Sequence, residues 1–336
     1  MFEKRALITG ITGQDGAYLA KFLVNKGYKV YGAYRRASTR NFWRLHYLDV
    51  KKDVELIPLD LLDQTSIMQA IKTVEPDEIY NLAAQSFVGD SFSEPIATAE
   101  VSGLGVLRVL DSIRLLNPKI KFYQASTSEM YGNSSDEPQH ELTPFHPASP
   151  YAAAKLYAHW IVRNYREAYG LFACAGILFN HESPIRGVEF VTKKITDAVA
   201  RIKLGMTDYL PLGNLDAKRD WGFAGDYVKA MWLMLQQKEP DDYVVATGET
   251  HTVREFCQMA FAEAGLDYEK YVRIDEKFKR PRDVVYLQGN SEKAQRVLGW
   301  NPKETTFAGL VKMMVDADMD KYRNPEKFMK HFLKHI

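Results

Sequence analysis

The first half of the sequence predicts an α/β fold in which a parallel sheet carries helices on both faces. Short runs rich in Val, Ile, Leu and Tyr alternate with stretches of helical periodicity, and a glycine-rich turn follows the first run directly. Strands separated by helices form βαβ units, and strands that are apolar throughout suit a sheet buried on both sides. We therefore expect a Rossmann-type sheet.

Each expected strand is an apolar run bounded by turn residues, and each expected helix lies between two such runs. The strands are Arg5–Thr9, Lys29–Tyr34, Val54–Leu59, Glu78–Leu82, Lys121–Ala125 and Phe172–Phe179. The helices are Asp15–Asn25, Gln64–Val74, Glu94–Leu116 and Pro150–Tyr169.

After residue 180 the alternation gives way to longer polar loops, which indicates a smaller mixed α/β substrate domain. We predict a dinucleotide-binding domain over 1–180 and a mainly substrate-binding domain over 181–336, with room for the chain to return to the sheet. The basic tail Tyr322–Ile336 is expected to be a surface helix or packing segment. The other segments expected in this half are the loops His181–Gly187, Tyr209–Arg219 and Lys277–Asp283 and the helices Val188–Leu204, Ala224–Gln236 and Val253–Ala264.

Composition narrows the class of protein. With 336 residues, of which 46% are hydrophobic, the chain can bury a large core. The 44 Lys and Arg residues nearly balance the 43 Asp and Glu residues, so no strong field draws the protein to nucleic acid or to a membrane surface. The two cysteines have no paired spacing, and no stretch of the chain could span a bilayer. We expect a cytoplasmic protein without a metal site.

The glycine-rich turn has the form of a dinucleotide site. Glycine is needed where the backbone turns sharply, where it approaches a pyrophosphate and where helix and strand pack closely, and the phosphates then meet the free N–H groups of the following helix. A structural turn is the alternative, but strand, turn and helix follow in the required order. The candidate cofactor contacts here are Gly10, Thr12, Gly13, Gln14, Asp15 and Gly16.

The second expected strand runs directly into Arg35 and Arg36, with Ser38 shortly after. A NAD enzyme would be expected to place an acid here for the ribose 2′-hydroxyl, whereas arginine suits a 2′-phosphate through charge-assisted bidentate bonds. The sequence therefore favours NADP. A solvated basic loop remains an alternative for one of the two arginines.

Tyr151 and Lys155 are four residues apart and so lie on one face of a helix. Such a pair is usually an ordinary buried contact, but downstream of a dinucleotide fold it suits catalysis. A lysine charge and a positive nicotinamide would both lower the pKa of Tyr151 towards neutrality. Tyr151 could then take a hydroxyl proton while hydride leaves the same carbon, and Lys155 would also hold the ribose.

The fifth expected strand runs into a polar segment, Ser126-Thr127-Ser128-Glu129. Ser126 and Ser128 can be explained as turn residues, but a carboxylate beside a cofactor cleft costs solvation energy unless it is used or paired. Glu129 could remove the C5 proton of a hexose oxidised at C4 and then protonate the departing C6 hydroxyl. Hydride would return to C6 and C5 would be reprotonated, so that the net change is loss of water and NADP is regenerated. Thr127 would donate a hydrogen bond to the C4 oxygen.

The glycine spacing resembles that of the extended short-chain dehydrogenase/reductase superfamily, and longer motifs resemble the GDP-mannose 4,6-dehydratase family. The specific stretches are Phe179-Asn-His-Glu-Ser-Pro-Ile-Arg-Gly187 and Glu189-Phe-Val-Thr-Lys-Lys-Ile195, and they are supported by the segments around Glu129, Tyr151, Leu212 and Arg219. The resemblance implies a lyase that converts GDP-mannose into GDP-4-keto-6-deoxy-mannose with NADP retained, for GDP-fucose or GDP-rhamnose biosynthesis.

The resemblance also implies roles for individual residues. Those expected to be catalytic are Thr127, Glu129, Tyr151 and Lys155. The further cofactor contacts are Asp60, Leu61, Leu82, Ala84, Gln85, Ser86, Tyr151, Lys155, His181 and Arg186. The substrate contacts are Ser86, Thr127, Ser128, Glu129, Asn180, Glu189, Val191, Lys194, Leu212, Gly213, Arg219 and Arg280.

The sequence departs from the family at Ala97, where a tyrosine is frequent, and at Arg282 and Asp283, where Thr-Glu is usual. Family members commonly form dimers or tetramers, so we expect a homodimer or homotetramer that uses the loop Ser38–His46. A loop folded on its own domain is the alternative. Rival functions are another nucleotide-sugar dehydratase, a UDP-glucuronate decarboxylase or an epimerase on the same fold, and a non-catalytic NADP-binding sensor.

Overall fold

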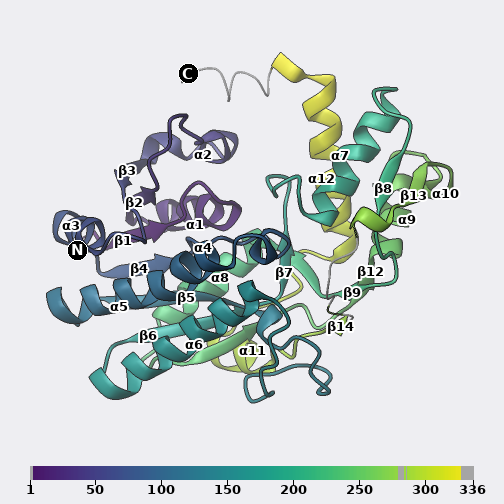
Figure 1. Ribbon diagram of the computed structural model, residues 1–336. Coiled ribbons are helices and arrows are strands. Elements are labelled where there is room, and N and C mark those ends of the chain that lie inside the picture. Colours follow the sequence, from purple (N-terminus) through teal and green to yellow (C-terminus); the bar gives the residue numbers. More distant parts are fainter. Residues whose placement is uncertain (1–2, 279–283, 285, 327–336) are drawn as a thin grey trace.

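The computed structural model describes residues 3–278, 284 and 286–326 (Figure 1). Its centre is a seven-stranded sheet with the order β11-β6-β5-β4-β1-β2-β3, and every neighbouring pair in it is parallel. The predicted Rossmann-type α/β fold is therefore confirmed. The strands of this sheet are β1 (Arg5–Thr9), β2 (Lys29–Tyr34), β3 (Val54–Pro58), β4 (Glu78–Asn81), β5 (Lys121–Thr127), β6 (Ala173–Leu178) and β11 (Asp242–Val245).

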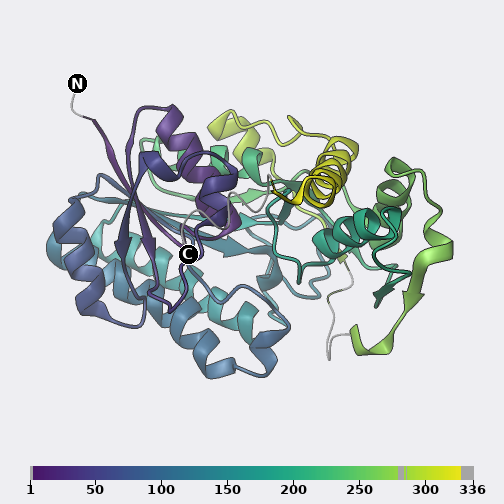
Figure 2. The ribbon, with the colours of Figure 1, turned by 90° about the horizontal axis from the view of Figure 1, so that it is seen from above.

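Two layers of helices cover the sheet (Figure 2). Neighbouring residues of β1 point to opposite faces, so Ile8 enters one apolar core and Leu7 the other. The first core includes α1 (Gln14–Asn25), α8 (Ala224–Leu235) and α11 (Glu292–Leu298). The second includes α3 (Gln64–Val74), α5 (Gly105–Leu116) and α6 (Pro150–Tyr169).

The register of the sheet brings the carboxyl ends of its central strands together. Thr9 at the end of β1 pairs with Ala33 of β2 on one side and with Asn81 of β4 on the other, and Asn81 pairs in turn with Gln124 of β5. The chain leaves β1 towards β2 but reaches β4 and β5 on the opposite side. This reversal opens a crevice at the strand ends, where open α/β sheets bind ligands.

A second group of elements lies beside the sheet (Figure 1). Its separate apolar core joins three helices, α7 (Val191–Lys203), α9 (Val253–Glu263) and α12 (Phe307–Arg323). The chain also returns to the sheet, because β11 pairs with β6. A domain boundary at residue 180 stays a prediction. The short strands of this half are β7 (Asn180–Glu182), β8 (Leu210–Leu212), β9 (Lys218–Arg219), β10 (Trp221–Phe223), β12 (His251–Thr252), β13 (Val272–Ile274) and β14 (Tyr286–Leu287).

Several short helical elements complete the structure. The α-helices are α2 (Trp43–Tyr47), α4 (Pro95–Ala99) and α10 (Tyr268–Tyr271), and the 3₁₀ turns are Lys51–Asp53, Asp90–Phe92, Ser128–Met130 and Glu276–Phe278. A π-helical segment, Glu100–Leu104, joins α4 to α5.

The structure corrects three expectations. The single helix Glu94–Leu116 is wrong, because the π-helical segment divides it. The expected loop Tyr209–Arg219 contains β8 and β9, and the expected loop His181–Gly187 begins inside β7. Strands of two or three residues carry too little hydrophobic alternation to be recognised in a sequence. Helices α11 and α12 were not predicted.

Some expectations cannot be compared with the structure. Arg280, Arg282 and Asp283 lie outside the described residues, as do residues 327–336 of the basic tail. Within the described part of the chain, no helix is long and apolar enough to cross a membrane, and no group of three or more His, Cys, Asp or Glu residues could hold a metal ion.

Candidate active site

A pocket at the carboxyl ends of β1, β4 and β5 gathers many of the predicted site residues. It extends from the glycine-rich turn to the first two turns of α6 and to the chain after β6. The predicted residues that line it are Gly10, Gly13, Gln14, Asp15, Gly16, Leu82, Ala84, Ser86, Thr127, Ser128, Glu129, Tyr151, Lys155, Asn180, His181 and Arg186.

The turn between β1 and α1 leaves no room for a side chain at Gly10 or Gly16. Gly10 has a φ of +70°, and a Cβ there would lie 2.8 Å from the backbone nitrogen of Ala83. A Cβ on Gly16 would lie 2.4 Å from the carbonyl oxygen of Gly10. Gly13 is the N-cap of α1 and provides no side-chain cap, so the first amides of this helix are directed at the pocket. These features fit the diphosphate of a dinucleotide.

Asp15, in the first turn of α1, is neutralised by His181. The His181 Nε2 atom lies 2.7 Å from the Asp15 carboxylate, and its Nδ1 atom lies 2.7 Å from the carbonyl oxygen of Phe179. Burial raises the pKa of Asp15, but the charge and hydrogen bond of His181 outweigh it and lower the pKa to about 2. Burial lowers the pKa of His181, but Asp15 raises it more. The pair therefore places a compensated carboxylate beside the expected diphosphate.

The turn after β4 is fixed by hydrogen bonds from its backbone. The amides of Leu82 and Ala83 each donate to the Thr9 hydroxyl at 3.1 Å, and the amide of Gln85 donates to the Ser102 hydroxyl at 3.1 Å. Ser102 lies in the π-helical segment, so this irregular turn supports the wall of the pocket. The side chain of Gln85 donates to the carbonyl oxygen of Phe87.

Helix α6 begins at the pocket and presents Tyr151 and Lys155 to it. Ser149 caps the helix by accepting a hydrogen bond from the Ala152 amide, and Pro150 occupies its first turn. Both functional side chains are buried, and the ammonium of Lys155 donates to the carbonyl oxygen of Ala125 at 3.0 Å. This bond ties α6 to the end of β5.

The expected lowering of the Tyr151 pKa by Lys155 is not produced by the protein's own residues. Burial raises the pKa of Tyr151, and a hydrogen bond with Thr127 opposes this rise only in part. Burial also lowers the pKa of Lys155 to about 8. The Lys155 ammonium is bonded to a backbone carbonyl and lies 5.9 Å from the centre of the Tyr151 ring. The residues that partly offset the effect of burial on the Tyr151 pKa are Thr127 and Arg186.

Strand β5 continues two residues beyond its expected end and so places Thr127 directly before the 3₁₀ turn that carries Glu129. The Thr127 hydroxyl accepts a hydrogen bond from the Glu129 amide at 3.3 Å. The Glu129 side chain is half-buried, lines the pocket with Tyr151 and is close enough for its charge to raise the Tyr151 pKa. A carboxyl group, a hydroxyl and a phenol thus line one pocket.

The residues expected at the adenosine end are at the ends of β2 and β3. Arg35, Arg36 and Ser38 follow β2 and are exposed, and the register of β2 on β1 places their segment beside the glycine-rich turn. Asp60 follows β3 and is half-buried, whereas Leu61 is buried in the second core. None of these five residues lines the pocket around Tyr151.

Several residues expected to contact the substrate lie outside the pocket, around α7, β8 and β9. Glu189 is exposed, and Leu212 is buried in the core of this group. Burial lowers the pKa of Lys194 at the start of α7, and the charge of Asp275 opposes this shift. Arg219 is buried, and its guanidinium donates to the carbonyl oxygen of Lys218 at 2.8 Å. The structure does not bring Glu189, Val191, Lys194, Leu212, Gly213 or Arg219 to the pocket wall.

Sequence reasoning missed some residues of the site. Arg44 donates to the carbonyl oxygens of Ile185 at 2.8 Å and of Thr12 at 3.1 Å, which holds the glycine-rich turn against the segment after β7. Phe190 was also missed, and its ring centre lies 3.6 Å from the guanidinium of the predicted residue Arg186, a cation–π contact at the pocket edge. The lining residues that were not predicted are Ala125, Ser126, Leu178, Phe179, Val88 and Phe190. The first four lie at the ends of expected strands, and this position could have indicated them.

The parallel sheet, the glycine-lined helix start and the Tyr/Lys pair together define a dinucleotide-binding protein of the short-chain dehydrogenase/reductase type. Solved structures share the fold. The UDP-glucose 4-epimerase of Thermus thermophilus, in complex with NAD, has a TM-score of 0.81 and 27% identity, covering 94% of this chain and 98% of that one. The dTDP-glucose 4,6-dehydratase of Streptomyces venezuelae has a TM-score of 0.83 and 22% identity, covering 97% and 99%.

Sequence relatives narrow the class. A family model described as GDP-mannose 4,6 dehydratase matches residues 7–314. GDP-mannose 4,6 dehydratase 2 of Arabidopsis thaliana is 55% identical over 328 residues, which cover 95% of this chain and 87% of that protein. The human GDP-mannose 4,6 dehydratase is 51% identical over 347 residues, which cover 95% and 93%. The chain belongs to the GDP-mannose 4,6-dehydratase family.

Proposed function

We propose that this protein is a lyase that removes water from GDP-mannose to give GDP-4-keto-6-deoxy-mannose with a retained NADP. The observation that carries the proposal is the placement of Glu129, Thr127 and Tyr151 around one pocket beside a glycine cradle. The relatives named as GDP-mannose 4,6-dehydratases support the choice of substrate.

The residues of the pocket have distinct tasks in this reaction. Bound NADP⁺ would supply hydride acceptance and return, together with a positive ring charge beside the phenol. Tyr151 accepts the proton of the C4 hydroxyl, and Thr127 donates a hydrogen bond to the C4 oxygen as negative charge develops there. Glu129 removes the C5 proton, which a C4 ketone acidifies, and then protonates the C6 hydroxyl as it leaves as water. When hydride returns to C6, C5 takes up a proton again, and the proton that Tyr151 accepted from the C4 hydroxyl balances it.

The cofactor preference for NADP rests on Arg35 and Arg36. Both are exposed directly after β2, next to the glycine-rich turn, and two guanidinium groups suit a phosphate dianion better than a hydroxyl. Lys155, His181 and Arg186 would contact the remainder of the dinucleotide. The basic side chains Lys194, Arg219 and Arg280 would bind the diphosphate of the nucleotide sugar through charge-assisted hydrogen bonds.

Mass spectrometry of the product tests the function. Incubation with GDP-mannose and a trace of NADP⁺ is expected to give a product lighter by one water, with no net consumption of cofactor. Parallel reactions with UDP-glucuronate and dTDP-glucose separate the rival enzymes. Release of CO₂ from UDP-glucuronate alone would replace the proposal by a decarboxylase, and no reaction with any of the three would favour a non-catalytic binder.

We also propose that the protein forms a homodimer or homotetramer. Within the expected contact loop, Phe42 and Leu45 are buried in their own subunit, and the residues exposed enough to offer a partner most of their surface are Ser38–Asn41. Gel filtration that shows a monomer would reject this proposal. A location in the cytoplasm stays a prediction from the sequence.

A further inference from the structure

His159 lies on the same face of α6 as the two functional residues Tyr151 and Lys155. The three side chains are spaced by four residues and are buried, with exposed fractions of 8% for Tyr151, 4% for Lys155 and 2% for His159. His159 does not line the pocket and has no part in the proposed chemistry. A buried imidazole in line with a Tyr/Lys pair therefore needs its own explanation.

The three side chains bind three consecutive residues of β5. Tyr151 is hydrogen-bonded to Thr127, and Lys155 donates to the carbonyl oxygen of Ala125 at 3.0 Å. The Nδ1 atom of His159 lies 3.1 Å from the hydroxyl oxygen of Ser126. The first two contacts involve groups that take part in the proposed reaction. The contact of His159 with Ser126 does not, so it can hold α6 on β5 without a role in the chemistry.

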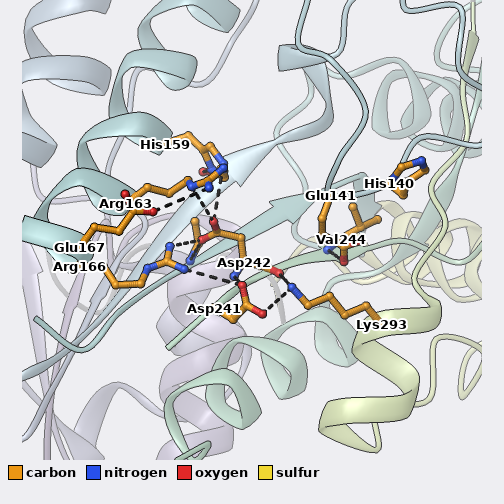
Figure 3. Close-up of polar contacts among 12 residues, drawn as sticks. His140, Glu141, His159, Arg163, Arg166, Glu167, Asp241, Asp242, Val244 and Lys293 are labelled. Atoms are coloured by element: carbon orange, nitrogen blue, oxygen red, sulfur yellow. Dashed lines mark hydrogen bonds and ion pairs between the residues drawn. The ribbon is translucent and has the colours of Figure 1, made fainter. Parts of the chain in front are cut away.

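Asp242 of β11 faces the other side of the imidazole (Figure 3). Its carboxylate lies 4.0 Å from the Nε2 atom of His159. The same carboxylate is held by the guanidinium of Arg166 at 2.5 Å and by the amide of Ala175 at 3.2 Å, with the Arg163 guanidinium 3.8 Å away. The Asp242 carboxylate is thus held by several donors next to one ring nitrogen of His159.

This environment selects one state of the ring. Burial lowers the pKa of His159 to about 4, Asp242 opposes the shift, and Arg163 and Arg166 add to it. The ring is therefore neutral near pH 7 and carries one N–H. The Asp242 carboxylate favours the proton on Nε2, which leaves Nδ1 as an acceptor for the Ser126 hydroxyl.

His159 is also connected to the turn that carries Glu129. The ring of Phe145 makes an edge contact with His159 at 5.3 Å between centroids and stacks on Tyr131 at 5.2 Å. Tyr131 is the C-cap of the 3₁₀ turn that contains Glu129. The imidazole therefore lies on the helix that carries Tyr151 and contacts Phe145, which packs on the turn that carries Glu129.

We propose that His159 is a positioning residue for the dehydration: oriented by Asp242, it accepts a hydrogen bond from Ser126 and so fixes the distance between Tyr151 on α6 and Thr127 and Glu129 at the end of β5. The inference rests on the function proposed above. A misplacement of reacting groups by about 1 Å can cost about 100-fold in rate, so loss of such a support affects turnover more than binding.

Substitutions at His159 separate hydrogen bonding from simple packing. His159→Asn keeps an acceptor near the position of Nδ1, whereas His159→Leu fills the space without one. We expect kcat for GDP-mannose to fall about 10-fold in His159→Leu and in Ser126→Ala, to stay within about threefold of the wild type in His159→Asn, and KM to change less than about twofold in all three. Glu167→Gln, which removes only a surface contact with Arg163, is the control and should leave kcat unchanged.

The double variant His159→Leu/Ser126→Ala sharpens the test, because both changes break the same hydrogen bond. Its kcat should be no lower than that of either single variant. A multiplied loss, an Asn variant as slow as the Leu variant, or a wild-type kcat in His159→Leu would each overturn the proposal.

Nuclear magnetic resonance of ¹⁵N-labelled histidine gives a readout independent of activity. In the wild type, His159 should be a neutral ring with the proton on Nε2, and its Nδ1 resonance should shift in Ser126→Ala. A proton on Nδ1 would overturn the proposed orientation even in an active enzyme. If instead the wild type does not dehydrate GDP-mannose while the expected resonances are seen, the proposed function fails and the positioning of Tyr151 must be sought in another reaction of the same pocket.

Discussion

The two walls of the pocket are built in different ways. The first wall, made by the turns after β1 and β4, consists of backbone amides and of glycines where a Cβ would collide with main chain. The second wall, made by the end of β5 and the start of α6, consists of side chains that are buried or half-buried and that are hydrogen-bonded to one another or to neighbouring backbone. Shape defines the first wall, and chemical groups define the second.

The difference predicts how each wall responds to mutation. A substitution in the first wall adds atoms where none fit, so it should weaken cofactor binding before it affects chemistry. A substitution in the second wall can leave the shape unchanged and remove one reactive group, so turnover should fall while folding and binding persist. Variants that violate this division would show that the two walls are not independent.

The largest effect is expected for Glu129→Gln in the second wall. The amide keeps the size of the side chain but cannot accept the C5 proton or donate one to the C6 hydroxyl, so the dehydration rate should fall about 1,000-fold. Oxidation at C4 does not need this group, so NADPH absorbance should still develop when GDP-mannose is added. The exposed Glu239→Gln is the control. Undiminished dehydration in Glu129→Gln would refute the assigned role.

The next effect in size is expected for Gly16→Ala in the first wall. A Cβ there would lie 2.4 Å from the Gly10 carbonyl oxygen and 2.8 Å from the Cα atom of Ile11, so the turn has to move away from the dinucleotide. We expect NADPH to bind about 100-fold more weakly, as measured by fluorescence titration. Gly103→Ala, whose nearest contact would be 3.4 Å, should bind NADPH normally. If Gly16→Ala bound NADPH as tightly as the wild type, the glycine-rich turn would not be the cofactor contact.

The sequence was most informative where a local pattern determines the structure. Apolar runs predicted β1 and β2 with their observed bounds, and the spacing of Tyr151 and Lys155 predicted a shared helix face. The glycines of the first turn lie, as their motif predicts, where backbone segments approach each other too closely for a Cβ. These predictions needed no knowledge of distant contacts.

What the sequence did not reveal depends on distant residues. The π-helical segment arises where Ser102 bonds to Gln85, and β11 joins the sheet although it is separated from β6 by more than sixty residues. The pKa of Tyr151 could not be read from its spacing to Lys155, because the ammonium is bonded to Ala125 of β5. Burial and a remote carbonyl, not sequence proximity, decide the protonation of this pair.

The stability of the protein should depend on pH through His159, which lies behind the second wall. Its pKa is lowered to about 4 by burial, with Asp242 opposing and Arg163 and Arg166 assisting, whereas an unfolded histidine titrates near pH 6.5. The unfolded state therefore binds more protons between these values, so the contribution to stability is present above about pH 6.5 and is lost as the pH falls towards 4.

Denaturant unfolding at pH 7 and pH 5 measures this effect. Between these two pH values, the free energy of unfolding of the wild type should fall by about 2 kcal/mol more than that of His159→Asn, which cannot titrate. Other acid-sensitive groups act in both proteins and cancel in the difference. Parallel pH profiles for the two proteins would mean that His159 is not held neutral by its surroundings.

The smallest effect concerns the outer edge of the first wall, where side chains rather than backbone are expected to select the cofactor. Arg35 and Arg36 are exposed after β2, so each can meet a 2′-phosphate with little change elsewhere. Replacing either one by Ser should reduce the preference for NADP over NAD by about 10-fold, mainly by weakening NADP, since exposed charge contacts are screened by water and salt. Titration with both cofactors at two salt concentrations measures the preference, and the exposed Arg40→Ser is the matched control. If only one arginine changes the preference, the other belongs to a solvated loop; if neither does, selection for the phosphate lies within the backbone wall itself.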